Sequence, residues 1–289
     1  MYTQLQLRGS ARPPVTLATL DKMRADGEAI AALTCYDASF AVLLDEADVD
    51  LVLVGDSLGM VIQGHDTTVP VTMDHMVYHT RAVARGLYRP FLVADLPFMS
   101  YSSPEQALAN SVRLMQEGGA RMVKLESGAE QLRIVEFLAG HDIAVCAHLG
   151  LKPQSVHKTG GFRVQGRQKD AAERIQREAL DLESAGADIL LLECIPNELG
   201  QAVTEAVSVP VIGIGAGPGA SGQIQVLYDI LDITSGRKPK FVRNFMQGVD
   251  SPLAAIKAYV GAVKSREYPG PEHTCHAQNQ SGCYGDNNG

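Results

Sequence analysis

The sequence of 289 residues has no tryptophan, few other aromatic residues and only five cysteines. The cysteines form no CxxC pair and show no regular spacing, which gives no support to a zinc or redox motif. Three of them lie inside apolar runs, where cysteine behaves as a small hydrophobic residue. We therefore expect structural cysteines and a reducing, cytoplasmic setting. The five are Cys35, Cys146, Cys194, Cys275 and Cys283.

A basic surface and a long apolar run are also missing. Lysine and arginine number 25 against 33 aspartate and glutamate, a net charge of −8. No basic patch is rich in aromatic residues, which argues against a nucleic-acid partner. No apolar run is long enough to span a bilayer, and residues 1–14 lack the apolar core of a secretory signal. We expect a protein with neither a nucleic-acid nor a membrane partner.

What the sequence does contain is an alternation of short apolar runs with segments of helical spacing. This pattern predicts βα units and a parallel sheet that is buried on both faces. Seven or eight such units in about 250 residues fit an α/β fold of the closed (β/α)₈ barrel type better than an open sheet. Strands are expected at 29–36, 50–55, 91–96, 122–126, 143–149, 188–195, 209–214 and 224–231, and helices at 38–47, 74–86, 104–118, 129–140, 171–186 and 198–207.

The chain divides into an arm, a barrel and a tail. Residues 1–28 form the arm with a short helix at 19–25, residues 29–266 the catalytic barrel, and residues 267–289 a polar, disordered tail. Two long segments, 56–73 and 150–170, directly follow strands. Such loops lie at the C-terminal face of a barrel, where enzymes of this fold keep their sites.

Four of the apolar runs close on an acid: Asp56, Asp95, Glu126 and Glu193. All strands of a barrel point the same way, so these acids converge on one rim. Lys124 precedes Glu126 by two residues and therefore shares its face of the strand. Gathered carboxylates repel one another, and a hard dication such as Mg²⁺ relieves that repulsion. The pattern predicts a metal-assisted site for an anionic, oxygen-rich small molecule.

Glu193 and His148 each allow more than one interpretation of their role. Apolar neighbours on both sides of Glu193 would raise the pKa of its carboxyl group and suit a general base. His148 closes an apolar run, which fits a hydrogen-bonded core residue and a substrate contact equally. Any single strand-end acid could instead cap a helix or stabilise a turn, as Asp56 could before Ser57.

The segment GIGAGPGASG at 213–222 is similar to a dinucleotide-binding loop, but its glycine spacing is irregular. A fingerprint of that kind normally opens a βαβ unit near the start of its domain. We therefore interpret the segment as a tight turn after the seventh strand.

The motifs, in their order, resemble the ketopantoate hydroxymethyltransferase family over about residues 15–265. Departures are few, and the segment SGQIQVLYDILDI matches less well. The motifs are LTCYD (33–37), VGDSLGMVIQGHDTT (54–68), VADLPFMSY (93–101), VKLE (123–126), HLGLKPQS (148–155), GGFRVQGR (160–167), LLLECIP (190–196), PVIGIGAG (210–217) and KFVRNF (240–245).

The resemblance implies a (β/α)₈ barrel of the phosphoenolpyruvate/pyruvate type that assembles as a homodecamer. It implies transfer of a one-carbon unit from 5,10-methylenetetrahydrofolate to 3-methyl-2-oxobutanoate, in pantothenate synthesis. The basic loop 152–169 is a candidate contact for the folate. Position by position, Asp56 and Asp95 match direct Mg²⁺ ligands, Glu126 a looser one through water, Ser57 and Lys124 substrate contacts, and Glu193 the general base. We also expect Asp56 and Asp95 to take part in substrate binding, and His148 to do so by its place at the rim.

The residues alone are also compatible with other functions. A barrel lyase that cleaves a carbon–carbon bond next to a Mg²⁺-bound oxo acid would need the same metal ligands. Such lyases often carry a cysteine in a mobile loop, and neither long loop here has one. A non-catalytic sensor would need an effector domain, which the sequence does not suggest. An NAD-dependent oxidoreductase would depend on GIGAG alone.

Overall fold

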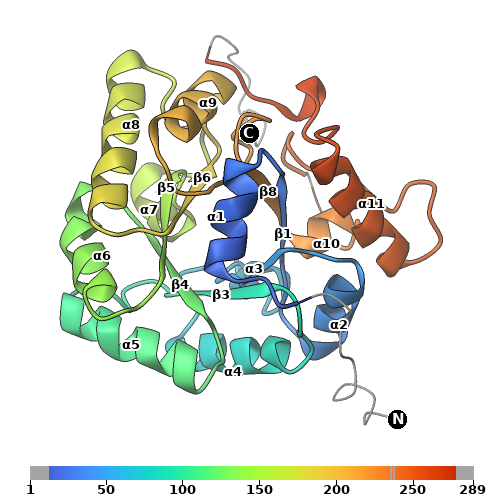
Figure 1. The fold of residues 1–289 in the computed structure, drawn as a ribbon, viewed down its shortest axis with the longest axis horizontal. Coiled ribbons are helices and arrows are strands. Elements are labelled where there is room, and N and C mark those ends of the chain that lie inside the picture. Colours follow the sequence, from blue (N-terminus) through green and yellow to red (C-terminus); the bar gives the residue numbers. More distant parts are fainter. Residues whose placement is uncertain (1–12, 235, 237, 278–289) are drawn as a thin grey trace.

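A computed structural model describes residues 13–234, 236 and 238–277. Its centre is a closed barrel of eight parallel strands in chain order, with helices around the outside (Figure 1). The predicted (β/α)₈ barrel is thereby confirmed. The strands are β1 (Ile30–Thr34), β2 (Leu51–Val54), β3 (Phe91–Asp95), β4 (Met122–Glu126), β5 (Val145–Gly150), β6 (Ile189–Glu193), β7 (Val211–Ile214) and β8 (Gly222–Gln225).

The strands are apolar on both faces because the barrel has two separate cores. Along β3, Leu92 and Ala94 face outward and join the cluster beneath the helices. Phe91 and Val93 face inward and join the cluster that fills the barrel. Burial on both faces explains why the strands read as continuous apolar runs rather than as alternating ones.

Several helices begin at a side chain that caps the first turn, as expected for serine, threonine and aspartate. These caps are Thr16, Asp37, Thr72, Ser103 and Ser251. Within the described residues, no helix is both long and apolar enough to cross a membrane. The helices are α1 (Leu17–Ala25), α2 (Ala38–Glu46), α3 (Leu58–Val61), α4 (Met73–Ala84), α5 (Pro104–Gln116), α6 (Leu132–Ala139), α7 (Val156–Thr159), α8 (Lys169–Ser184), α9 (Asn197–Ala206), α10 (Leu227–Ile230) and α11 (Pro252–Lys264), with 3₁₀ turns η2 (Ala129–Gln131), η3 (Pro153–Ser155) and η4 (Pro271–His273).

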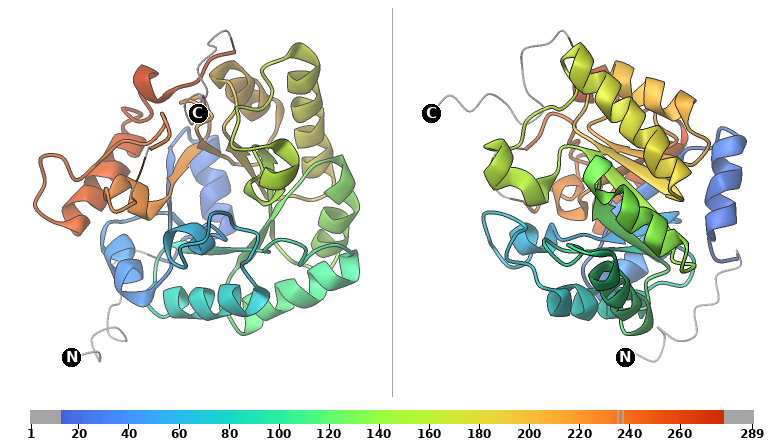
Figure 2. Two further views of the ribbon diagram at one scale, coloured as in Figure 1. Left: turned by 180° about the vertical axis from the view of Figure 1, so that it is seen from behind. Right: turned by 90° about the vertical axis from the view of Figure 1, so that its left-hand side faces the viewer.

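Helix α1 closes one end of the barrel, and α3 and α7 lie at the other end (Figure 2). Leu20 and Met23 of α1 are buried in the cluster that fills the barrel. Val15, just before α1, bonds through its N–H to the carbonyl of Arg89 at 2.8 Å, next to the start of β3. The closed end is therefore the N-terminal end of the strands, and the C-terminal ends face α3 and α7.

The prediction for the eighth unit was wrong in its extent. Strand β8 covers Gly222–Gln225 instead of 224–231, and the helical turn α10 follows it. The apolar residues after the strand belong to that turn, since Leu227 and Ile230 bury one face at a helical spacing. Helices α3, α7 and α11 were not predicted from the sequence.

The glycine-rich segment after β7 is a turn, as predicted. Gly215 and Gly217 have φ angles of 62° and 82°, in the region that favours glycine. The chain then enters β8 with no helix between, so the segment does not open a βαβ unit. This arrangement removes the structural basis for a dinucleotide fingerprint.

The expectation of a disordered tail is wrong for residues 267–277. His273, Thr274 and Cys275 are buried against the barrel. The carbonyls of Thr274 and Cys275 accept hydrogen bonds from Lys240 and from the backbone N–H of Asn197, both at 2.8 Å. The polar composition of the segment suggested disorder because composition gives no information about such backbone contacts. Residues 278–289 lie outside the described part of the chain.

Candidate active site

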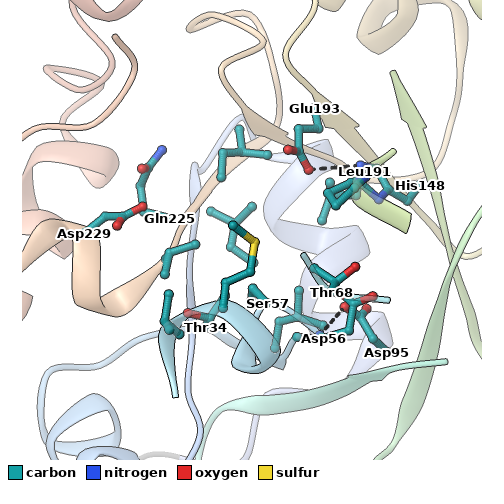
Figure 3. A pocket seen from close by; sticks show the side chains of 18 of the residues that line it. Thr34, Asp56, Ser57, Thr68, Asp95, His148, Leu191, Glu193, Gln225 and Asp229 are labelled. Carbon is teal, nitrogen blue, oxygen red and sulfur yellow. Dashed lines mark hydrogen bonds and ion pairs between the residues drawn. The ribbon is translucent and has the colours of Figure 1, made fainter. Parts of the chain in front are cut away.

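A cavity of about 350 Å³ opens at the C-terminal ends of the strands. Figure 3 shows Asp56 and Asp95 on one side of it, with His148 and Glu193 on another. Every residue that the sequence analysis proposed for the site lines this cavity. These residues are Asp56, Ser57, Asp95, Lys124, Glu126, His148 and Glu193.

The strand ends position these side chains as the topology requires. Asp95, Glu126 and Glu193 are the last residues of β3, β4 and β6. Lys124 and Glu126 both line the cavity, as their spacing of two residues predicted. Asp56 lies two residues beyond the end of β2. The register of parallel strands thus brings acids that are far apart in the chain to one rim.

Lys124 and Asp95 form a buried ion pair, with 2.8 Å between Nζ and Oδ1. The other oxygen of Asp95 accepts a hydrogen bond from the backbone N–H of Asp56 at 3.0 Å. Burial alone would lower the pKa of Lys124, but the carboxylates of Asp95 and Asp56 outweigh burial and raise that pKa. The cavity therefore holds a fixed positive charge beside its acids.

The carboxyl groups in the cavity crowd one another. Burial first, and then the charge of Asp95, raise the pKa of Asp56 to about 7, against the opposing effects of Lys124 and Gln154. Burial and the charge of Asp56 raise the pKa of Glu126 well above its usual value. One lysine does not offset this concentration of acid, so the site favours an additional cation.

The donor set fits Mg²⁺. Asp56, Asp95 and Glu126 offer only oxygen atoms, the ligands that this ion prefers. Within the described ranges, no three His, Cys, Asp or Glu side chains enclose a metal by themselves. Mg²⁺ does not need such a cage, since it usually takes one or two carboxylates and completes its shell with water and substrate oxygens.

Gln154 joins the acids, although it was not predicted from the sequence as a site residue. Its Nε2 donates to Asp56 Oδ2 at 2.8 Å, and its backbone N–H donates to Glu126 Oε1 at 2.8 Å. Its Oε1 accepts a hydrogen bond from the hydroxyl of Tyr101 at 2.6 Å. The residue belongs to η3 in the long loop after β5. The available signal was an amide side chain in a loop that directly follows a barrel strand.

His148 lies between the lysine and the predicted base. Its Nδ1 is 3.5 Å from Lys124 Nζ, and its Nε2 is 3.3 Å from Glu193 Oε2. Burial and the charge of Lys124 lower the pKa of His148 well below its usual value, which favours the neutral imidazole. The residue lines the cavity, so it is available to a ligand as well as to its neighbours.

Ser57 starts α3 and is held by a hydrogen bond of 2.9 Å to the hydroxyl of Tyr36. Asp56 does not serve as a helix cap here, since Ser57 is the N-cap residue of α3 and no side chain caps that helix. Oδ2 of Asp56 instead accepts a hydrogen bond from Gln154. Gly55 allows this close arrangement, since a Cβ there would lie 2.8 Å from Ser57 Oγ. The segment is therefore shaped to present Asp56 and Ser57 to the cavity.

A family profile and individual relatives both match this chain and point to the same family. A profile described as ketopantoate hydroxymethyltransferase matches residues 14–271. The chain is 55% identical over 267 residues to the 3-methyl-2-oxobutanoate hydroxymethyltransferase of Alkalilimnicola ehrlichii, which covers 92% of this chain and 96% of that protein. It is 56% identical over 255 residues to the enzyme of the same name from Nitrosococcus oceani, which covers 88% of this chain and 97% of that protein.

Solved structures of other enzymes share the fold. A phosphonopyruvate hydrolase complex with oxalate and Mg²⁺ matches with a TM-score of 0.57 at 14% identity, covering 73% of this chain and 80% of that one. A 2,3-dimethylmalate lyase of the PEP mutase/isocitrate lyase superfamily matches with a TM-score of 0.51 at 14% identity, covering 72% and 80%. At such identities the likeness shows the fold alone, which is the closed eight-stranded barrel described above.

Proposed function

The chain belongs to the ketopantoate hydroxymethyltransferase family, and from this premise we propose its reaction in detail. It transfers a hydroxymethyl group from 5,10-methylenetetrahydrofolate to 3-methyl-2-oxobutanoate, giving 2-dehydropantoate and tetrahydrofolate. The observation that carries this proposal is the buried pair of Lys124 and Asp95 beside two further acids in one cavity. We place the reaction in pantothenate biosynthesis in the cytoplasm.

Lys124 and Ser57 would bind the oxo acid. The lysine is buried and positively charged, so it attracts the keto oxygen as negative charge builds there. The hydroxyl of Ser57 is oriented by Tyr36 and can donate to the substrate carboxylate. Charge that is held in place before the reaction stabilises an enolate without further reorganisation.

Glu193 would remove the proton from carbon 3 of the oxo acid. It lies at the end of β6, across the cavity from Asp56 and Asp95 (Figure 3). Neutral His148 lies next to it and would contact the substrate between the base and Lys124. One C–N bond of the methylene bridge would open, the enolate carbon would attack the methylene carbon, and water would break the remaining C–N bond, which leaves the hydroxymethyl group on the product and releases tetrahydrofolate.

Mg²⁺ would be held by Asp56, Asp95 and Glu126. When bound, the ion supplies Lewis-acid stabilisation of negative charge on the substrate oxygens. Support comes from the oxygen-only donor set and from the raised pKa values of Asp56 and Glu126.

Hydrogen exchange at carbon 3 tests this proposal. The protein is incubated with 3-methyl-2-oxobutanoate in D₂O without folate, and the carbon 3 proton is followed by NMR with and without Mg²⁺. We expect loss of the signal that depends on Mg²⁺. In Glu193→Gln, Mg²⁺ and substrate binding should persist while exchange falls by roughly 100-fold or more, the scale of general-base catalysis. Normal exchange in that variant would exclude Glu193 as the base.

We also propose that the chain forms a homo-oligomer, a decamer by resemblance to the family. Large apolar side chains on its surface, such as Tyr78 and Met99, are candidates for contacts between chains. Light scattering during size-exclusion chromatography should give the mass of ten chains. The mass of a single chain would contradict the proposal.

A further inference from the structure

The cavity has a second polar end that the proposed chemistry on the oxo acid does not use. Gln225, the last residue of β8, and Asp229 of α10 lie next to each other, away from Asp56 and Asp95 (Figure 3). Both line the same cavity as the acids. A cavity of about 350 Å³ lies within the range of roughly 300–1,000 Å³ that drug-sized ligands occupy, so it exceeds the needs of a five-carbon acid.

Gln225 indicates that this second end binds a ligand. The residue is 1% exposed, and its Oε1 has no hydrogen-bond partner among the described residues. A buried amide oxygen without a partner carries a free-energy cost that natural structures usually avoid. A ligand that donates a hydrogen bond inside the cavity would remove that cost.

The charge at this end restricts the class of ligand. Asp229 contributes a carboxyl group, and Lys124, far along the wall, is the only Lys or Arg side chain of the described residues that lines the cavity. Burial raises the pKa of Asp229, against the opposing effects of Thr234 and of Lys238, which is itself paired with Asp232. An anionic group would therefore be repelled, whereas a ring edge with adjacent N–H donors would be bound by two parallel hydrogen bonds.

Apolar side chains make up another part of the cavity wall. Met60, Ile214, Ile224 and Phe241 line the same cavity as the two polar ends. Such a surface suits the faces of a flat ring. The cavity thus combines hydrogen-bond acceptors, apolar wall and the acids of the reaction site.

We propose that Gln225 and Asp229 form the subsite for the reduced pterin ring of the one-carbon donor. The aminopyrimidinone edge of a pterin carries a 2-amino group beside N3–H, which matches the carboxylate of Asp229. The second hydrogen of the 2-amino group can donate to Oε1 of Gln225. The one-carbon unit is attached at the other ring, so an anchored edge directs it toward the oxo acid. This inference rests on the proposed function, since the proposed reaction supplies the folate.

The test separates this subsite from the enolising site. Isothermal titration measures tetrahydrofolate binding in the presence of Mg²⁺ and 3-methyl-2-oxobutanoate, and NMR measures folate-free exchange at carbon 3. In Asp229→Asn, the Kd for tetrahydrofolate should rise roughly 10- to 100-fold, the scale of one hydrogen bond to a charged group. The exchange rate, to which the subsite contributes nothing, should stay within about twofold. Asp170→Asn, an exposed acid of α8, is the matched control and should change neither.

A ligand that lacks the 2-amino group identifies the contact. The native chain should bind a 2-desamino tetrahydrofolate more weakly than tetrahydrofolate by a similar factor, and Asp229→Asn should lose most of this discrimination. Unchanged tetrahydrofolate binding in Asp229→Asn, or exchange that falls in parallel with it, would overturn the subsite. If that variant does not fold, Gln225→Met is measured in the same way, and the same outcomes decide. Failure of the native chain to exchange carbon 3 while it binds tetrahydrofolate would count against the proposed base and leave the subsite standing.

Discussion

At the scale of single residues, Gln154 keeps the acids of the cavity in place. Its side-chain amide and its backbone N–H donate to different carboxyl groups, those of Asp56 and Glu126. The hydroxyl of Tyr101 orients the amide in turn. Groups that donate hydrogen bonds to metal ligands fix the orientation of those ligands and tune their affinity for the ion.

We expect Gln154→Leu to weaken the affinity of the site for Mg²⁺. The variant has a similar volume but lacks the amide donor to Asp56, so that carboxylate loses its orientation. The Mg²⁺ concentration for half-maximal carbon 3 exchange should rise roughly 10- to 100-fold. Gln116→Leu, an exposed glutamine of α5, is the control. An unchanged Mg²⁺ titration would show that Gln154 has no such positioning role.

The strand-end acids could be predicted from the sequence, and Gln154 could not. Asp95, Glu126 and Glu193 close strands whose direction is set by the fold, so topology alone brings them together. Gln154 reaches the cavity through the path of a long loop, which no periodicity describes. The same holds for Asp229, whose helical turn was taken as part of a strand.

At the scale of elements, segments with a strong repeat were predicted well. Helix α5 was expected at 104–118 and spans Pro104–Gln116, with Ser103 as its cap. Single turns such as α3 and α10 were missed, since one turn gives no repeat to detect. The helix predicted in the N-terminal arm is present as α1, but its role in closing the barrel depends on contacts far along the chain.

We expect Leu20→Ala to destabilise the barrel without altering the site. Leu20 is fully buried where α1 covers the interior core. Truncation of such a leucine lowers the free energy of unfolding by about 2–5 kcal/mol. Urea denaturation measures this change, and Lys22→Ala on the exposed face of the same helix should leave stability nearly unchanged. A lower kcat in the folded variant would contradict the separation of α1 from the site.

At the scale of the whole molecule, a buried charge cluster ties the start of the barrel to its last long helix. Asp50, 1% exposed, accepts a hydrogen bond from the backbone N–H of Ala31 in β1 at 3.0 Å. Its carboxylate also pairs with Lys264 of α11 at 2.6 Å and with Arg89 at 3.3 Å. One side chain thus joins β1, α11 and the segment before β3.

We expect Asp50→Asn to weaken this closure. The substitution keeps an acceptor for Ala31 but leaves the charges of Lys264 and Arg89 without their shared carboxylate. Removal of one partner from a buried ion pair costs about 3–5 kcal/mol, and the value should lie near the lower end because Lys264 also pairs with Glu28. The free energy of unfolding in urea measures the loss.

Asp26→Asn provides the matched control for Asp50→Asn. Asp26 forms its ion pair with Lys22 at the surface, where such a pair contributes little. The two substitutions remove the same charge, so any difference between them reports burial and the number of partners. If both variants unfold at the same urea concentration as the native chain, the cluster around Asp50 does not hold the ends of the barrel together, and closure depends on the β1–β8 pairing alone.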